Sequence, residues 1–253
     1  MATCMTEPSD VQTTNGFLLG GRVRYAQPRD GFRSGIEPVL LAACIPARSG
    51  QRVLEAGTGA GAALLCLMAR VAGLSGVGVE RDPAMAALAR DNAAANGFDG
   101  MEIVTADIVR AAENGLAGGF DHAFANPPYH PAGGTPSGIS ARETAKRAHA
   151  GLFGVWATSL GTLLRPRGTL TLILPASALP ACLLALDAAN CPAATLLPLW
   201  PKADRQAKLV LLRGIRQGRG ALKLLPGLVL HTAEGGFSPE AEAILRDGAG
   251  LPI

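Results

Sequence analysis

The feature that most constrains the fold of this chain is an alternation, from residue 52 onward, of short apolar runs with longer segments of helical periodicity. A chain patterned in this way folds into parallel strands joined by helical crossovers that cover both faces of one sheet. Strands are expected over 52–56, 76–80, 101–104, 120–125, 168–174, 193–199 and 207–213, with helices over 60–72, 83–96, 143–164 and 177–189. Because no helix separates the last two strands, the pattern predicts an α/β fold whose mostly parallel, seven-stranded sheet ends in an antiparallel hairpin.

The segments on either side of this core are predicted to be appendages of a single domain over 16–253, because no linker composition divides the chain. We expect a flexible polar tail over 1–15, a hairpin and a helix over 16–50, the core over 51–215 and an extension over 216–253. The hairpin is placed at 18–24 and its helix at 37–45, and the extension is expected to add one strand within 222–231 and a closing helix within 234–246.

Composition places the chain among globular proteins, since 48% of its residues are apolar and 17% are charged. Pro, Gly or Arg interrupts every apolar run before it reaches the length of a membrane span, and residues 1–15 lack the pattern of a secretory signal. The five cysteines form no CxxC motif, and the four histidines share no ligand spacing with them. These features predict a cytoplasmic protein with reduced cysteines and no metal site.

A glycine-rich turn, Gly57-Thr58-Gly59-Ala60-Gly61, lies where the first core strand meets the first core helix. Glycines there permit a tight turn and let a ligand approach the backbone. Glu80 ends the next strand 23 residues after Gly57, a position suited to accept hydrogen bonds from ribose hydroxyls. The dinucleotide pattern places its third glycine three residues after the second, but position 62 is alanine. The spacing therefore favours S-adenosylmethionine over a dinucleotide.

Two further acids flank this predicted cofactor pocket, and each has a structural alternative. Glu55 precedes the turn by two residues and suits a cationic sulfonium amino acid, although a strand-end acid can instead cap nearby amides. Asp107 follows the third strand and can accept a hydrogen bond from an adenine amino group, with Ile108 beside the ring. The alternative for Asp107 is a helix N-cap, which is common for Asp at a strand-to-helix turn.

The tetrapeptide Asn126-Pro127-Pro128-Tyr129 follows the fourth core strand and is the most informative motif of the chain. Its prolines fix φ and supply no N–H, so their carbonyls are held stiffly between an amide side chain and an aromatic ring. Such a cluster can accept hydrogen bonds from an exocyclic amino group while the ring stacks on the planar system that bears it. A rigid turn that merely ends the strand is the alternative. If the fourth strand adjoins the first, the tetrapeptide lies beside the glycine turn, where open sheets bind ligands.

The segments EAGTGAG (55–61), GVGVERD (76–82), TADI (105–108) and NPPY together resemble the class I, S-adenosylmethionine-dependent amino methyltransferases. That resemblance covers about residues 50–175 and is specific for the cofactor and for the type of target atom. A narrower resemblance, to the bacterial tRNA1(Val) adenine-37 N6-methyltransferase family, extends over nearly the whole chain. It is carried by Leu19-Gly20-Gly21-Arg22, Gln27-Pro28, Gly31-Phe32-Arg33, Pro38-Val39-Leu40-Leu41-Ala42-Ala43 and Lys208-Leu209-Val210-Leu211-Leu212-Arg213-Gly214.

The resemblance implies a Rossmann-like class I methyltransferase fold and methyl transfer from S-adenosyl-L-methionine to N6 of adenine in tRNA, with S-adenosyl-L-homocysteine as product. It implies that the catalytic residues are Asn126, Pro127, Pro128 and Tyr129. It also implies cofactor contacts from Gln27, Arg33, Glu55, Ala56, Gly57, Gly59, Gly61, Glu80, Arg81, Asp107, Ile108 and Asn126. For Gln27 and for Phe32, hairpin structure and core packing are the respective alternatives.

Basic residues indicate where a nucleic acid can bind, although the net charge of the chain is only +3. Seven cations stand between Lys202 and Lys223 against one acid, Asp204, and a further basic segment follows the tetrapeptide. We expect phosphate contacts from Arg142, Lys146, Arg147, Lys202, Arg205 and Lys208. A solvated face without a partner is the alternative for both groups.

Three other functions share these features. A protein glutamine N5-methyltransferase and an rRNA guanine-N2 methyltransferase act on nitrogens that are delocalised as the adenine amine is. The glutamine-modifying enzymes usually carry a separate helical domain ahead of the core, and the short segment before residue 52 favours RNA instead. A non-catalytic RNA-binding scaffold that retains the fold is the third alternative, and the intact glycines and NPPY speak against it. The oligomeric state stays open.

Overall fold

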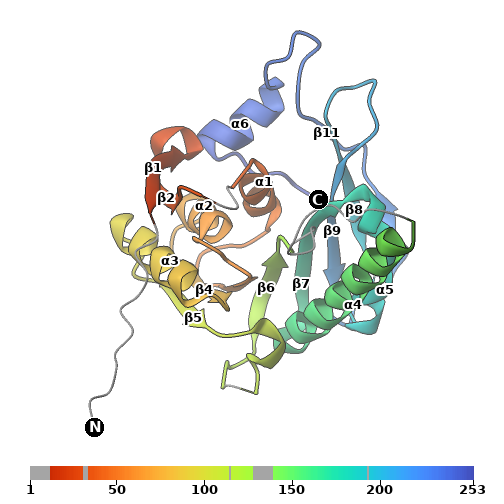
Figure 1. Ribbon diagram of the computed structural model, residues 1–253, viewed down its shortest axis with the longest axis horizontal. Coiled ribbons are helices and arrows are strands. Elements are labelled where there is room, and N and C mark those ends of the chain that lie inside the picture. The colour runs from red at the N-terminus through yellow and green to blue at the C-terminus, as the bar shows by residue number, and fades with distance from the viewer. Residues whose placement is uncertain (1–11, 31–33, 114, 128–138, 193) are drawn as a thin grey trace.

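The computed structural model describes residues 12–30, 34–113, 115–127, 139–192 and 194–253, with the backbone alone over 139–150. Within these ranges it contains a nine-stranded sheet and a separate two-stranded hairpin (Figure 1). The sheet is formed by β3 (Arg52–Ala56), β4 (Ser75–Glu80), β5 (Met101–Thr105), β6 (Phe120–Ala125), β7 (Leu164–Pro175), β8 (Thr195–Trp200), β9 (Leu209–Ile215), β10 (Lys223–Leu224) and β11 (Leu228–Val229). The hairpin is formed by β1 (Thr13–Leu18) and β2 (Val23–Pro28).

Six α-helices lie within the described ranges, together with three short 3₁₀ helices. The α-helices are α1 (Glu37–Cys44), α2 (Ala62–Arg70), α3 (Pro83–Ala95), α4 (Ile139–Leu163), α5 (Leu179–Ala188) and α6 (Pro239–Asp247). The 3₁₀ helices are η1 (Leu19–Gly21), η2 (Ile108–Arg110) and η3 (Ala176–Ala178). None of the helices that the structure describes combines the length and the apolar character needed to cross a membrane.

The strand order is β10-β8-β9-β7-β6-β3-β4-β5, with β11 paired to β8. Strands β3 to β7 pair in parallel, whereas β9 runs antiparallel to both β7 and β8. This arrangement confirms the predicted mostly parallel sheet that ends in an antiparallel hairpin. The chain fills one half of the sheet from β3 outward to β5 and then returns to place β6 on the other side of β3. The order therefore reverses between β3 and β6, which is where open α/β sheets bind their ligands.

The C-terminal extension differs from its prediction, because the single strand expected within 222–231 is divided into β10 and β11. Pro226 lies between the two pieces and has no N–H for a sheet ladder. Gly227 follows at φ +96, and a Cβ there would stand 2.6 Å from the carbonyl oxygen of Pro198. The indole of Trp200 donates to the Pro226 carbonyl at 3.1 Å. The sheet therefore has the seven strands predicted for the core and, where the extension was expected to add one strand, two strands of two residues each.

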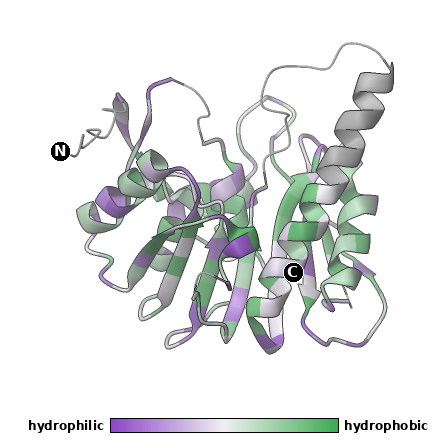
Figure 2. Cartoon of the chain, turned by 60° about the horizontal axis from the view of Figure 1, so that its bottom comes forward, coloured by the Kyte–Doolittle hydropathy of each residue, from purple (hydrophilic) through white to green (hydrophobic). Residues whose placement is uncertain are grey.

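Hydrophobic residues on the strands form two cores, one on each face of the sheet. Val53 packs into a cluster with residues of α1, α2, α3 and α6, whereas its neighbour Leu54 packs into a cluster with residues of η2, α4 and α5. Successive side chains of a strand point to opposite faces, so a strand buried on both faces is apolar throughout. Figure 1 shows the two helical layers on opposite sides of the sheet, and Figure 2 shows the strands between them as largely hydrophobic bands.

Boundaries of the core elements depart from the predictions by up to four residues, and the hairpin, predicted at 18–24, extends from Thr13 to Pro28. Helix α4 begins at Ile139 and β7 at Leu164, each four residues earlier than predicted. The first part of β7 pairs with β6 across a register shift between Phe120 and His122. Because of this shift, the first residues of β7 lack the regular residue pattern from which a strand is predicted. Strand β1 begins at Thr13, inside the segment predicted as a tail, and residues 1–11 lie outside the described part of the chain.

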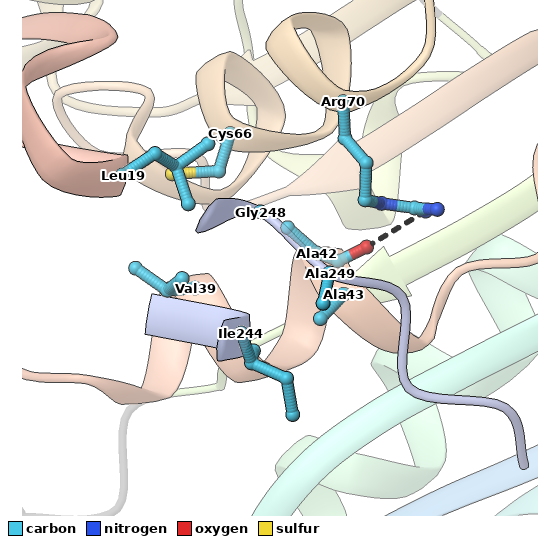
Figure 3. A pocket seen from close by; sticks show the side chains of 9 residues that line it. All are labelled: Leu19, Val39, Ala42, Ala43, Cys66, Arg70, Ile244, Gly248 and Ala249. Carbon is cyan, nitrogen blue, oxygen red and sulfur yellow. Dashed lines mark hydrogen bonds between the residues drawn. The ribbon is translucent and has the colours of Figure 1, made fainter. Parts of the chain in front are cut away.

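The N-terminal hairpin and the C-terminal helix pack together on the α1–α2 face. A pocket of about 10 Å³ remains where η1, α1, α2 and α6 meet, lined among others by Leu19, Val39 and Ile244 (Figure 3). Beside it, Arg70 donates to the Ala42 carbonyl at 3.1 Å. A space of this size holds at most about one water molecule, so this pocket is a packing gap that is too small for a ligand.

Candidate active site

The glycine turn joins β3 to α2 at the carboxyl edge of the sheet. The N–H groups of Gly57 and Thr58 both donate to the Val79 carbonyl, at 2.8 and 3.1 Å, and Gly61 donates to the Thr58 carbonyl at 2.8 Å. Gly57, Gly59 and Gly61 have φ values of +63, +56 and +92. Side chains rarely tolerate this left-handed conformation, so the turn depends on glycine at all three positions. A Cβ on Gly59 would meet only the Met85 methyl group at 3.8 Å, so the backbone there is open to a ligand.

Glu55 lies beneath this turn and is only 3% exposed. Its Oε2 accepts hydrogen bonds from the Thr58 hydroxyl at 2.6 Å and from the Leu64 N–H, in the first turn of α2, at 3.1 Å. Burial raises the pKa of the Glu55 carboxyl to about 8, the two hydrogen bonds lower it, and the charge of Glu80 raises it further. These contacts favour the capping alternative for Glu55. A direct contact with a sulfonium amino acid stays a prediction.

Glu80 bridges the glycine turn and the start of α3. Its Oε2 accepts from the Gly59 N–H and its Oε1 from the Asp82 N–H, each at 2.9 Å. A carboxylate can accept about four hydrogen bonds, so these two contacts orient Glu80 and leave capacity for ribose hydroxyls. The neighbouring Arg81 is exposed beside it. The ribose role of Glu80 stays a prediction that the geometry allows.

Asp107 and Ile108 lie one strand further along the same edge. Asp107 is the N-cap residue of η2, and its Oδ1 accepts from the Val109 N–H at 3.0 Å. This contact is the helix N-cap that was given from the sequence as the alternative for Asp107. The Asp107 side chain is also exposed, whereas Ile108 is 4% exposed and anchors η2 in the core. The N-cap bond uses only part of the acceptor capacity of the Asp107 carboxylate. The carboxylate can therefore also accept from an adenine amino group, and that contact stays a prediction.

The register of β3 and β6 places the tetrapeptide beside the glycine turn. Ala56 pairs with Ala125, so Gly57 and Asn126 follow directly from paired residues on adjacent strands. Neighbouring strands lie about 4.8 Å apart. Asn126 is partly buried and Pro127 is buried at the end of β6. The sequence places the tetrapeptide beside the glycine turn if the fourth core strand adjoins the first. The fourth core strand is β6, and it pairs with the first, β3.

Several predicted site residues fall outside the described part of the chain. These are Pro128 and Tyr129 of the tetrapeptide, Arg33 near the N-terminal helix, and the side chains of Arg142, Lys146 and Arg147 on α4. Their roles stay predictions.

Asn92 of α3 and Asn96, the C-cap of that helix, were not singled out in the sequence analysis, and they hold the N-terminal hairpin over the site. Asn92 accepts from the Ala26 N–H at 2.9 Å and donates to the Ala26 carbonyl at 2.8 Å, and Asn96 makes the same pair of bonds with Arg24 at 2.8 Å each. Asn92 also donates to the carbonyl of Ala60, in the glycine turn, at 2.9 Å. Their spacing of four residues, which puts them on one helix face, was the available signal.

Gln27 follows these paired residues on β2. Its Oε1 accepts from the Ser34 N–H at 3.2 Å, and the Tyr25 hydroxyl shares a hydrogen bond of 2.8 Å with the Ser34 hydroxyl. The asparagine contacts therefore position the end of the hairpin that carries Gln27. The observed contact agrees with the alternative for Gln27, a structural role in the hairpin. The role of Gln27 in cofactor binding stays a prediction.

The predicted basic run of residues 202–223 divides into an exposed part and a structural part. Lys202, Arg205 and Lys208 lie in the loop between β8 and β9. This loop is at the same sheet edge as the glycine turn, because β9 runs antiparallel to both β7 and β8, so that β8 ends at the edge where β7, β6 and β3 end. Lys202 donates to the Ala233 carbonyl at 2.8 Å, and Arg205 lies 4.0 Å from the exposed carboxylate of Asp204. Exposed pairs of this kind contribute little to stability.

Arg213 is a buried member of the same run, only 7% exposed. It donates to the carbonyls of Cys44 and Ile253, the latter at 2.6 Å, and to the Thr171 hydroxyl at 3.4 Å. Arg216 donates to the Ala189 carbonyl at 2.7 Å, beyond the end of β9 at the opposite sheet edge. A charge count along the sequence therefore overstated the basic surface, because two of these arginines satisfy backbone carbonyls.

Metal-binding chemistry finds no support among the described side chains, where no three His, Cys, Asp or Glu residues are grouped as ligands. The cysteines that the structure describes, Cys44, Cys66, Cys182 and Cys191, are buried and unpaired. Burial raises the pKa of the Cys66 thiol to about 12 and that of Cys44 to about 11. These thiols are therefore protonated core residues rather than nucleophiles.

Comparison with known proteins identifies the family. The model of the methyltransferase small domain matches residues 36–152. The tRNA1(Val) (adenine(37)-N6)-methyltransferase of Aeromonas hydrophila is 31% identical over 215 residues, which are 83% of this chain and 87% of the relative. The protein of the same name from Dickeya chrysanthemi is 29% identical over 243 residues, 92% of this chain and 94% of the relative.

Solved structures show the same fold. A predicted O-methyltransferase from Agrobacterium tumefaciens superposes with a TM-score of 0.72 at 23% identity, over 86% of this chain and 99% of that one. The 16S rRNA N2 G1207 methyltransferase of T. thermophilus, solved with AdoMet and guanosine, superposes with a TM-score of 0.56 at 19% identity, over 81% of this chain and 50% of that one. The Aeromonas hydrophila relative shows that the chain belongs to the tRNA1(Val) (adenine(37)-N6)-methyltransferase family, and the solved structures show that it has the class I S-adenosylmethionine-dependent methyltransferase fold.

Proposed function

We propose that the protein transfers the methyl group of S-adenosyl-L-methionine to the exocyclic N6 amino group of an adenine in tRNA. The observation that carries the proposal is the pairing of Ala56 with Ala125, which sets Gly57 and Asn126 side by side at the point where the strand order reverses. A site that transfers one carbon atom needs its cofactor turn and its acceptor cluster this close together. The relatives that share the whole chain carry names that state this activity.

The described residues suit the cofactor. The left-handed glycines leave the turn open on the side of Gly59, and Glu80 is held at that glycine with acceptor capacity to spare. In this proposal Glu80 holds the ribose and Asp107, with Ile108, the adenine ring. When bound, the cofactor supplies an activated methyl group on a sulfonium.

Asn126 and the Pro127 carbonyl hold the target nitrogen. The lone pair of an adenine amine is delocalised into the ring, which makes the nitrogen a poor nucleophile. Acceptors for its two hydrogens draw the nitrogen toward tetrahedral geometry and stabilise the positive charge that develops there. Fixing the nitrogen in line with the methyl group supplies much of the remaining rate enhancement. By the family resemblance, the Tyr129 ring stacks on the base.

The loop between β8 and β9 supports RNA as the partner. Lys202, Arg205 and Lys208 lie at the sheet edge that carries Asn126, on the side of β6 away from the cofactor strands β4 and β5. Cations there can follow a phosphate backbone while a base enters the site. Binding should then weaken steeply as salt rises.

The test compares Asn126 variants with three acceptor pools: unmodified tRNA, ribosomal RNA and total protein. Asn126→Ala removes one preorganised acceptor and should lower the turnover of methyl transfer to tRNA by roughly 100- to 1,000-fold. Its affinity for S-adenosylhomocysteine in calorimetry should stay within about threefold of wild type, because the glycine turn is untouched. Asn126→Asp is the matched control, since it keeps an acceptor oxygen and should retain more activity than Asn126→Ala.

Other outcomes separate the alternatives. Methyl transfer to ribosomal RNA or protein in preference to tRNA would replace the proposed substrate. Equal losses of turnover and cofactor affinity in Asn126→Ala would remove the assigned role of Asn126. A wild-type protein that binds tRNA but transfers no methyl group to any pool would be a scaffold.

A further inference from the structure

The indole of Trp156, on α4, covers one side of the first glycine of the turn. A Cβ built on Gly57 would stand 2.7 Å from Cη2 of Trp156, 3.3 Å from Cζ3 and 3.9 Å from Cζ2. The benzo edge of the ring therefore rests on the Cα of Gly57, in space that any other residue would fill with its side chain. Glycine is required at this position twice over, by its φ of +63 and by the ring beside it.

Helix α4, which carries Trp156, also packs against the second loop of the predicted cofactor site. Its neighbour there is η2, the short helix that begins at Ile108 directly after Asp107. The Trp156 side chain packs against the same hydrophobic cluster that holds Ile108. Helix α4 therefore borders the glycine turn through the Trp156 ring and the loop of Asp107 through η2, which are the two places assigned to the adenosyl part of the cofactor.

The exposure of this contact distinguishes it from core packing. Gly57 is exposed and Trp156 is only partly buried, whereas nearby core residues of the same helix, such as Phe153 and Ala157, are 2% and 0% exposed. A large apolar ring left partly open beside a ligand-binding turn can gain contact area when the ligand arrives. Helix α4 is also the next described element after β6 and the tetrapeptide, so the ring connects the cofactor turn with the helix that follows the acceptor cluster in the described part of the chain.

We propose that Trp156 is a positioning residue of the cofactor site, whose indole seats Gly57 and contacts the adenosyl moiety of bound S-adenosylmethionine. The inference rests on the cofactor site proposed above and adds a residue that the motifs do not contain. No step of the methyl transfer passes through Trp156. Its contribution is affinity for the cofactor and a fixed place for the turn.

The chain offers a direct spectroscopic test, because it has two tryptophans, Trp156 and Trp200. Trp200 ends β8 and bonds to Pro226 in the extension. Trp200→Phe leaves Trp156 as the single tryptophan, and titration of this variant with S-adenosylhomocysteine should change its emission saturably. The midpoint should match the dissociation constant from calorimetry within about twofold. Trp156→Phe keeps Trp200 as the single tryptophan and is the matched control, which should show no change.

Affinity gives the second readout. Trp156→Ala should raise the dissociation constant of S-adenosylhomocysteine roughly 5- to 100-fold, the range that stacking on an aromatic side chain contributes. Trp156→Phe keeps an aromatic ring and should recover most of that loss. A role confined to packing would lower the melting temperature of the cofactor-free protein and leave both the emission of Trp200→Phe and the relative affinities unchanged.

The outcomes distinguish this inference from the proposed function. If the wild-type protein binds no S-adenosylhomocysteine, the cofactor assignment itself is wrong. If the wild-type protein binds it while the emission of Trp200→Phe stays flat, Trp156 does not contact the cofactor. If Trp156→Ala does not fold, two other measurements decide the question: the emission titration of Trp200→Phe and the affinity of Trp156→Phe for S-adenosylhomocysteine. The dissociation constant of Trp156→Phe should exceed that of the wild type by at most about fivefold.

Discussion

Replacing Gly57 with alanine tests whether the glycine turn and α4 are coupled as the structure describes. Alanine adds one methyl group at a residue with φ +63, within 2.7 Å of the Trp156 ring. Gly59 is the matched control, because its φ of +56 is nearly the same and the nearest atom to an added Cβ is the Met85 methyl group at 3.8 Å. The two variants share the backbone cost and differ in the steric one.

The magnitudes follow from these distances. A left-handed conformation costs a residue with a Cβ about 1–2 kcal/mol, and this is the whole cost expected for Gly59→Ala. Overpacking a rigid ring typically costs about 1–3 kcal/mol more, so Gly57→Ala should lose about 2–5 kcal/mol. In a Trp156→Ala background the ring is gone, and adding Gly57→Ala should cost only about 1–2 kcal/mol, as Gly59→Ala does.

Urea unfolding of the cofactor-free protein, followed by circular dichroism, measures all of these differences without any assumption about activity. The expected result is a larger loss for Gly57→Ala than for Gly59→Ala, and a coupling with Trp156→Ala of about 1–3 kcal/mol. Equal losses for the two glycine variants, or strictly additive effects with Trp156→Ala, would refute the contact between the ring and the turn.

Two further predictions concern buried ionisable side chains. The carboxyl of Glu55 has a pKa of about 8 in the folded protein, above its ordinary value of 4.5, so the folded state keeps a proton that the unfolded chain releases. The stability that this proton contributes is present below pH 4.5 and is lost as pH rises toward about 8. Glu55→Gln should therefore flatten the fall in unfolding free energy between about pH 5 and pH 8. Parallel pH profiles of the wild type and the variant would contradict this. Arg213→Met leaves the carbonyl of Cys44 and other buried acceptors without their donor and should lower the unfolding free energy by at least about 2 kcal/mol in urea titrations, whereas a loss below about 0.5 kcal/mol would show that these bonds carry little.

The positions of the core strands and the mostly parallel sheet could be predicted because the information is local. Residues 52–56 and 120–125 are short apolar runs that end in a glycine turn and in a proline pair, and the structure has β3 and β6 at those residues. Right-handed crossovers and the chemistry of the two motifs then favour one sheet order. The extension was less predictable, because its division at Pro226 depends on the Trp200 indole across the sheet edge.

Side-chain roles were less predictable where they depend on contacts between distant residues. Trp156 meets Gly57 across 99 positions, and Arg213 meets Cys44 across 169. No periodicity carries that information, so Trp156 passed unnoticed and Arg213 was counted as surface charge. Glu55 shows the same limit, since its spacing to the glycines fits a ligand contact and a helix cap equally well.

The most direct test of the central claim is the identity of the nucleoside that receives the methyl group. Unmodified tRNA is incubated with the wild-type protein and S-adenosylmethionine labelled in the methyl group, then digested to nucleosides and separated by mass. The account predicts that the label appears as N6-methyladenosine and that Asn126→Ala abolishes most of it. Label in N2-methylguanosine, in a methylated ring nitrogen of adenine, or in no nucleoside at all would contradict it.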